Sequence, residues 1–157
     1  MTSAHDAYVS GLRLLARREL SVAQLRARLA RRCWSDSDIA EAIDRLRQDG
    51  ALDDRRMARA FASTAARVKG RGRLRILREL EAAGVDRDTA RAAVDDVFGE
   101  VDEGALLDRA IAKRLRGPIR DEGQFRRLHQ HLTRLGFPPA AIAAALRARY
   151  RRASPDE

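Results

Sequence analysis

Six basic side chains crowd into twelve residues near the middle of the chain: Arg67, Lys69, Arg71, Arg73, Arg75 and Arg78. They surround two glycines, Gly70 and Gly72, and no acidic residue occurs between Asp54 and Glu79 to neutralise them nearby. Clustered cations attract phosphates and carboxylates, so the chemistry that this stretch predicts is binding to a polyanion or to an acidic protein surface. The alternative is a solvated arginine-rich face with no partner.

The residue types that catalysis needs are sparse and poorly placed. His129 and His131 are two positions apart, which puts them on opposite sides of a predicted helix, where they cannot easily share a metal ion. The segment from Gly70 to Gly72 lacks the third glycine and the Gly-Lys-Ser/Thr ending of a phosphate-binding loop. We therefore expect no catalytic residue, no metal site and no cofactor, and we expect both histidines to be exposed.

The composition favours a helical protein with an anionic partner. The 157-residue chain is 45% hydrophobic but only 4% aromatic, a balance typical of helices rather than sheets. Its formal charge of +9 divides into +2 for residues 1–50, +3 for 51–99 and +4 for 100–157. Cys33 is the only cysteine, and we find no signal peptide and no bilayer-spanning run. These features predict a soluble, cytoplasmic protein that does not bind membranes.

Apolar residues at helical spacing predict the elements that must position the basic residues. The first helix is expected over residues 7–18, with Tyr8, Leu12 and Leu15 on its buried face. Val68 is expected to line the helix that precedes the basic stretch. Altogether the pattern predicts nine helices.

Capping residues mark where several of these helices begin. Ser21 followed by Gln24 is a capping-box pattern, which satisfies N–H groups at a helix start. The other predicted caps are Ser35, Asp86 and one of the adjacent pair Asp53 and Asp54.

The helices repeat with a period of about fifty residues. The register is Leu25, Leu29, Cys33, Ile39 and Ile43, then Ile76, Leu80, Gly84, Ala90 and Val94, then Leu128, Leu132, Gly136, Ile142 and Leu146. Because Cys33 aligns with two glycines, we interpret it as a small residue at a helix end. The predicted fold is all-α, with three tandem three-helix repeats at 1–50, 51–99 and 100–150 forming an elongated, curved array, and 151–157 as a flexible tail.

Several segments also resemble the RecX family, small helical modulators of the RecA recombinase. These are the run from Leu14 to Ser21, the run from Leu52 to Met57, the step Leu135-Gly136-Phe137 and, most specific, Lys69-Gly70-x-Gly72 followed by Arg75-Ile76-x-x-Glu79-Leu80. The chain departs from the family pattern at Arg73, where proline is usual, and at Met57, where phenylalanine is usual.

The resemblance implies three-helix repeats that bind in the groove of a RecA–DNA filament and lower its ATP hydrolysis, strand exchange and repressor co-cleavage. It implies no catalytic residue. The predicted protein is a monomeric, non-enzymatic regulator of the RecA filament that also contacts single- or double-stranded DNA. The alternative is a basic helical protein that binds the DNA backbone directly. On charge alone, the six residues from Arg67 to Arg78 are the first contact candidates, and the weaker ones are Arg17, Arg18, Arg26, Arg28, Arg114 and Arg116.

Overall fold

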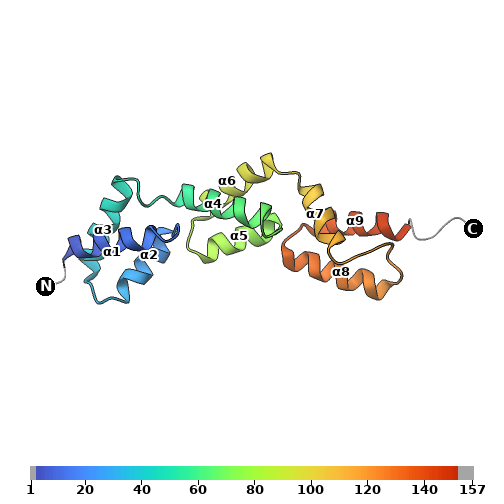
Figure 1. The fold of residues 1–157 in the computed structure, drawn as a ribbon, viewed down its shortest axis with the longest axis horizontal. Coiled ribbons are helices and arrows are strands. Elements are labelled where there is room, and N and C mark those ends of the chain that lie inside the picture. Colours follow the sequence, from blue (N-terminus) through green and yellow to red (C-terminus); the bar gives the residue numbers. More distant parts are fainter. Residues whose placement is uncertain (1–2, 152–157) are drawn as a thin grey trace, which may run out of the picture. The chain divides into compact units, whose positions relative to one another are not determined.

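A computed structural model describes residues 3–151 of the chain, with side chains up to residue 150. Within these residues every regular element is a helix (Figure 1). The helices are α1 (Ala4–Leu15), α2 (Val22–Ala30), α3 (Asp36–Gln48), α4 (Asp54–Arg67), α5 (Arg73–Ala82), α6 (Arg87–Glu100), α7 (Glu103–Ala112), α8 (Glu122–Leu135) and α9 (Pro139–Arg151). The predicted all-α helical-repeat fold is confirmed. None of the helices in this part of the chain is both long and apolar enough to cross a bilayer.

The chain divides into two compact units, each built from two segments that are separate in the sequence. The first comprises Met1–Phe61 with Glu79–Ala93, and the second comprises Ala62–Arg78 with Val94–Glu157. Helices α4, α5 and α6 therefore contribute residues to both units. The repeat boundaries at 50 and 99 stay a prediction. Of the predicted tail, Arg151 is the last residue of α9, and residues 152–157 lie outside the described part of the chain.

The first helix differs from its prediction in position and, at Leu12, in its buried face, whereas Tyr8 and Leu15 are half-buried and pack against the core as expected. It begins at Ala4, because the Ser3 hydroxyl accepts a hydrogen bond from the Asp6 N–H, and it ends at Leu15. Its buried residues are Ala7, Ser10 and Gly11, whereas Leu12 is 37% exposed. At Gly11 a Cβ would lie only 2.7 Å from the Leu46 Cδ1 of α3, so small side chains allow α1 and α3 to pack closely.

The predicted helix caps are confirmed. Ser21 and Gln24 form the capping box, and Asp86 accepts hydrogen bonds at the start of α6. Ser35 caps α3 by accepting from the N–H group three residues later. Of the two adjacent aspartates, Asp53 is the cap, since its Oδ1 accepts from the first N–H groups of α4. Asp54 Oδ1 instead accepts from the Val22 N–H at 2.8 Å, which ties the start of α4 to the start of α2.

The end of the second helix in each predicted repeat has the same left-handed backbone. The φ angles are 63° at Cys33, 82° at Gly84 and 96° at Gly136. Glycine adopts this region without steric cost, whereas a residue with a Cβ is disfavoured there. The interpretation of Cys33 as a helix-end residue is confirmed, and Cys33 is the one described non-glycine residue with a positive φ.

The residues of the repeat register form the core of each unit. In the first unit Leu25, Leu29, Ile39 and Ile43 are each at most 2% exposed and belong to one buried cluster. In the second unit the aligned side chains are also buried: Ile76, Leu128, Leu132, Ile142 and Leu146. Phe137, one step after Gly136, is fully buried. The predicted helical phase is therefore right for α2, α3, α5, α8 and α9.

Candidate binding surface

The basic turn, defined here as residues 67–78, joins α4 to α5 and begins with a tight reversal of the chain. Val68 and Lys69 donate main-chain hydrogen bonds back to Thr64, and the Arg71 N–H donates to the Ala65 carbonyl at 3.0 Å. Gly70 has a φ of 64°, the left-handed conformation that permits this turn. Lys69 is thereby placed at an exposed apex.

The start of α5 packs directly on the end of α8. The Gly72 N–H donates to the Leu135 carbonyl at 2.7 Å, and the Leu74 N–H donates to the Gly136 carbonyl at 3.0 Å. A Cβ on Gly72 would overlap the Gly136 carbonyl group, so the contact requires glycine. The N–H groups that a helix start would offer to an anion are thus engaged at these two positions by α8 carbonyls. The anion-attracting capacity of the basic turn rests on its side chains.

A matching junction lies in the first unit, at the positions related by the repeat register. There the Ser21 hydroxyl donates to the Ala83 carbonyl. The Ala23 side chain packs against Gly84 at the place that a Cβ on Gly84 would occupy. Ser21 aligns with Gly72, and Gly84 aligns with Gly136. In both units, therefore, the start of one repeat's second helix rests on the end of the next repeat's second helix.

Two of the basic-turn arginines are neutralised by acidic residues from later helices, contrary to the expectation from the sequence. The Arg67 guanidinium lies 3.1 Å from the Glu100 carboxylate. Arg73 lies 3.5 Å from Asp95 and 3.4 Å from Glu103, and its guanidinium stands over the Phe98 ring, 5.2 Å from the centroid. The Arg73 side chain therefore links α5 to α6 and α7 within the second unit and does not reach outward.

The remaining basic-turn residues divide by exposure. Arg71 and Arg75 are half-buried, and the Arg75 Nη1 donates to the Arg134 carbonyl at 3.5 Å. Lys69 and Arg78 are exposed, and no carboxylate of the described chain pairs with either. Lys69 and Arg78 therefore have the property that the sequence predicted for the whole stretch, a positive charge that no acidic side chain neutralises.

The weaker candidates are surface residues of both units. The first unit carries Arg17, Arg18 and Arg26, which are exposed, and Arg28, which is half-buried; the second carries Arg114 and Arg116, both exposed. The structure brings Arg114 together with Arg67 and Lys69 at one pocket. It does not bring Arg116 or the arginines of the first unit to that pocket.

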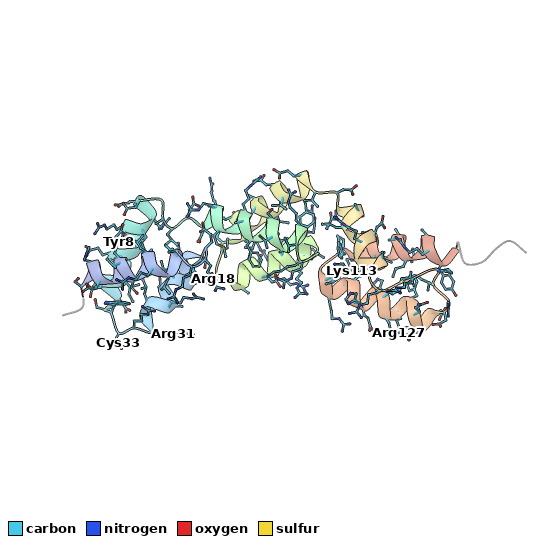
Figure 2. All side chains as sticks on the ribbon, viewed as in Figure 1. Tyr8, Arg18, Arg31, Cys33, Lys113 and Arg127 are labelled. Carbon is cyan, nitrogen blue, oxygen red and sulfur yellow. The ribbon has the colours of Figure 1, made fainter. Side chains whose placement is uncertain are left out.

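This cationic pocket, of about 410 Å³, lies between the basic turn, α7 and α8. Its five cationic side chains are Arg67, Lys69, Arg109, Lys113 and Arg114, and no carboxylate lines it. Sequence reasoning missed Arg109 of α7 and Lys113, the residue that caps the C-terminal end of α7 one helical turn later (Lys113 is labelled in Figure 2). Their four-residue spacing predicts a shared face, but nothing in the sequence shows that this face meets the basic turn.

Both histidines of α8 are half-buried, so the expectation that they are exposed is wrong. His131 lines the cationic pocket, and burial, followed by the charges of Arg114 and Arg134, lowers its pKa below the ordinary value of 6.5. His129 stacks on Phe125 at a centroid distance of 6.4 Å. Within residues 3–151 no group of three or more His, Cys, Asp or Glu side chains is arranged to hold a metal ion.

Comparison with known proteins finds one family along most of the chain. Residues 7–46 match the description "RecX, first three-helix domain", and residues 53–94 match "RecX, second three-helix domain". Regulatory protein RecX of Chromohalobacter salexigens is 37% identical over 127 residues, which cover 80% of this chain and 81% of that protein. Regulatory protein RecX of Pelodictyon phaeoclathratiforme is 31% identical over 147 residues, covering 92% and 89%.

Two crystal structures share the fold. RecX from Lactobacillus salivarius superposes with a TM-score of 0.73 at 18% identity, covering 92% of this chain and 95% of that one. A second structure, of a regulatory protein RecX, gives a TM-score of 0.78 at 17% identity, covering 92% and 71%. At such low identity these two matches support the fold alone.

Proposed function

The chain belongs to the RecX family of regulatory proteins, and from this premise we propose that it is a non-enzymatic regulator that binds the RecA recombinase filament on DNA. Binding lowers the ATPase, strand-exchange and co-protease activities of the filament, and so affects recombination, DNA repair and the SOS response. We further propose that it acts in the cytoplasm as a monomer.

The observation that carries this proposal is the extent of the family match. It includes both three-helix domain descriptions and, at 31% identity, 92% of the chain. The surface chemistry supports the same proposal, because exposed cations occur in both units and suit the phosphates or acidic side chains of a nucleoprotein filament.

Direct binding to DNA without a recombinase is the second candidate. The exposed Lys69 and Arg78, which lack carboxylate partners, favour it equally, because the phosphate backbone offers the same complementary charge. The two functions differ in stoichiometry. A filament regulator that acts at filament ends or in the groove works well below one molecule per recombinase monomer, whereas a DNA competitor must coat the DNA.

The test is a titration of RecA ATPase on single-stranded DNA. We expect inhibition at ratios far below one, and loss of that inhibition in a Lys69→Glu/Arg78→Glu variant. Arg31→Glu/Arg127→Glu is the control, since it changes the net charge equally at two exposed residues elsewhere (Figure 2). Inhibition that appears only when the protein saturates the DNA supports direct DNA binding instead. No inhibition at any ratio, from protein that is folded by circular dichroism, refutes the filament proposal.

A further inference from the structure

The cationic pocket of the second unit combines charge with an exposed apolar rim. Val68 lines it and is 76% exposed, the most exposed of the large hydrophobic side chains in the described residues. The sequence pattern predicted that Val68 lines the helix before the basic stretch, and this expectation is wrong, because α4 ends at Arg67 and the next residue begins the turn. An apolar side chain left in water beside a cationic pocket is a feature that the fold itself does not use.

The apolar character continues into the pocket. Leu106 and Ala110 of α7 are buried, Leu135 of α8 is half-buried, and all three line the pocket together with Val68. A ligand that fills this pocket meets aliphatic groups on its floor and rim, with cationic groups around them.

The cationic groups are suited to carboxylates. Arg67 already pairs with a carboxylate of this chain, Glu100, at 3.1 Å. The described chain provides no such partner for Lys69, Arg109, Lys113 or Arg114. These four charges are available to carboxylates from another molecule, and their attraction is strengthened by the absence of any acidic group in the lining.

We propose that this pocket binds an acidic peptide segment of a partner protein, with one aliphatic side chain of that segment placed against Val68, Leu106 and Leu135. A nucleic acid fits less well. No Phe, Tyr or Trp side chain lines the pocket to stack on a base, the one ring in its lining, His131, is half-buried, and phosphates alone leave Val68 exposed to water. The proposal goes beyond the regulation of a recombinase and does not require that the partner be one.

The test measures fluorescence anisotropy of the full-length protein with labelled peptides of about twelve residues at low salt. One peptide consists of glutamate and aspartate with a central leucine, and the other has serine in place of that leucine. We expect the leucine peptide to bind about three- to tenfold more tightly, the effect of burying one aliphatic contact. Val68→Ser should bring this ratio close to one while leaving a salt-sensitive, charge-dependent affinity.

Charge reversal tests the rim. Lys113→Glu/Arg114→Glu should weaken the leucine peptide about tenfold or more, whereas Arg31→Glu/Arg127→Glu, with the same change in net charge, should change its affinity no more than about twofold. Circular dichroism establishes that each variant is folded.

Three outcomes overturn the proposal. One is no detectable binding of either peptide. Another is equal loss of affinity in the two charge-reversal variants, which indicates general electrostatic attraction. The third is tighter binding of a labelled oligothymidine that depends on Lys113 and Arg114, which makes the pocket a nucleic-acid site. Because the assay contains no recombinase, its failure leaves the proposed filament function unaffected, and the converse also holds.

Discussion

Replacing Gly72 by alanine should destabilise the second unit through a main-chain clash. A Cβ at Gly72 would lie 2.6 Å from the Phe137 nitrogen and would also overlap the Gly136 carbonyl group. Main-chain atoms cannot rotate aside as a flexible side chain can, so α5 and α8 must separate. Overpacking of this kind costs about 1–3 kcal/mol, and weakening of the 2.7 Å hydrogen bond from Gly72 to Leu135 adds about 1 kcal/mol.

The expected total of about 2–4 kcal/mol lowers the melting temperature by roughly 4–16 °C for a protein of this size. Thermal denaturation followed by circular dichroism measures this shift. Gly99→Ala is the matched control, because Gly99 lies within α6 and a Cβ added there would have nothing within 4 Å of it. That substitution should raise the melting temperature by about 1–4 °C, since alanine is favoured over glycine in helices by about 0.5–1 kcal/mol. If Gly72→Ala melts at or above the temperature of the parent protein, the backbone contact between α5 and α8 is wrong.

Three further predictions concern the core, the ion pairs and pH. Ile76→Ala should cost about 2–5 kcal/mol in chemical denaturation, because Ile76 is fully buried; an unchanged denaturation midpoint would contradict its core position. Arg73→Ala should cost about 1 kcal/mol by loss of its half-buried ion pair with Glu103, its exposed pair with Asp95 and its ring contact, whereas Arg78→Ala should be neutral within about 0.5 kcal/mol; equal melting of the two variants would rule out a stabilising role for the Arg73 contacts. Because the pKa of His131 is lower in the folded protein than its ordinary value of 6.5, its contribution to stability is complete above that value and is lost as the pH falls from 6.5 towards the folded pKa. NMR titration should show this lowered pKa, and Arg114→Gln should raise it; a pKa that does not move in the variant would contradict the effect of the Arg114 charge.

The features that could be predicted from the sequence are those set by short-range spacing. Ile76 and its repeat equivalents are buried because an apolar stripe at helical spacing has to face a core. The capping box at Ser21 depends on residues three positions apart. The first helix was misplaced because its cap at Ser3, three positions before Asp6, was overlooked. Its close contact with α3 was missed because Gly11 packs there through its lack of a side chain, and a search for apolar residues does not detect such a contact.

The electrostatics of the basic turn could not be predicted in this way. The sequence gap between Asp54 and Glu79 indicates an uncompensated cluster, but Glu100 and Glu103 reach Arg67 and Arg73 through tertiary packing. Pairs separated by about thirty residues leave no periodic signal. The same limit applies to the cationic pocket, whose α7 residues meet the basic turn only in the folded second unit. Charge counts along a sequence thus identify candidate cations, and packing decides which of them remain unpaired.

The contact between α5 and α8 at Gly72 and Gly136 is made largely by main-chain atoms, so the packing of the two helices depends little on which side chains lie on the surface beside it. Main-chain groups make the joint, through the hydrogen bonds from Gly72 and Leu74 to the Leu135 and Gly136 carbonyls. These main-chain hydrogen bonds do not depend on the charge of the neighbouring side chains, of which Arg75 adds one further hydrogen bond, to the Arg134 carbonyl of α8. Substitutions around the joint can recharge this face, or adapt it to a differently charged partner, while the underlying scaffold keeps its shape. A protein designer could use the second unit in the same way, by keeping the two glycines and redrawing the charges beside them.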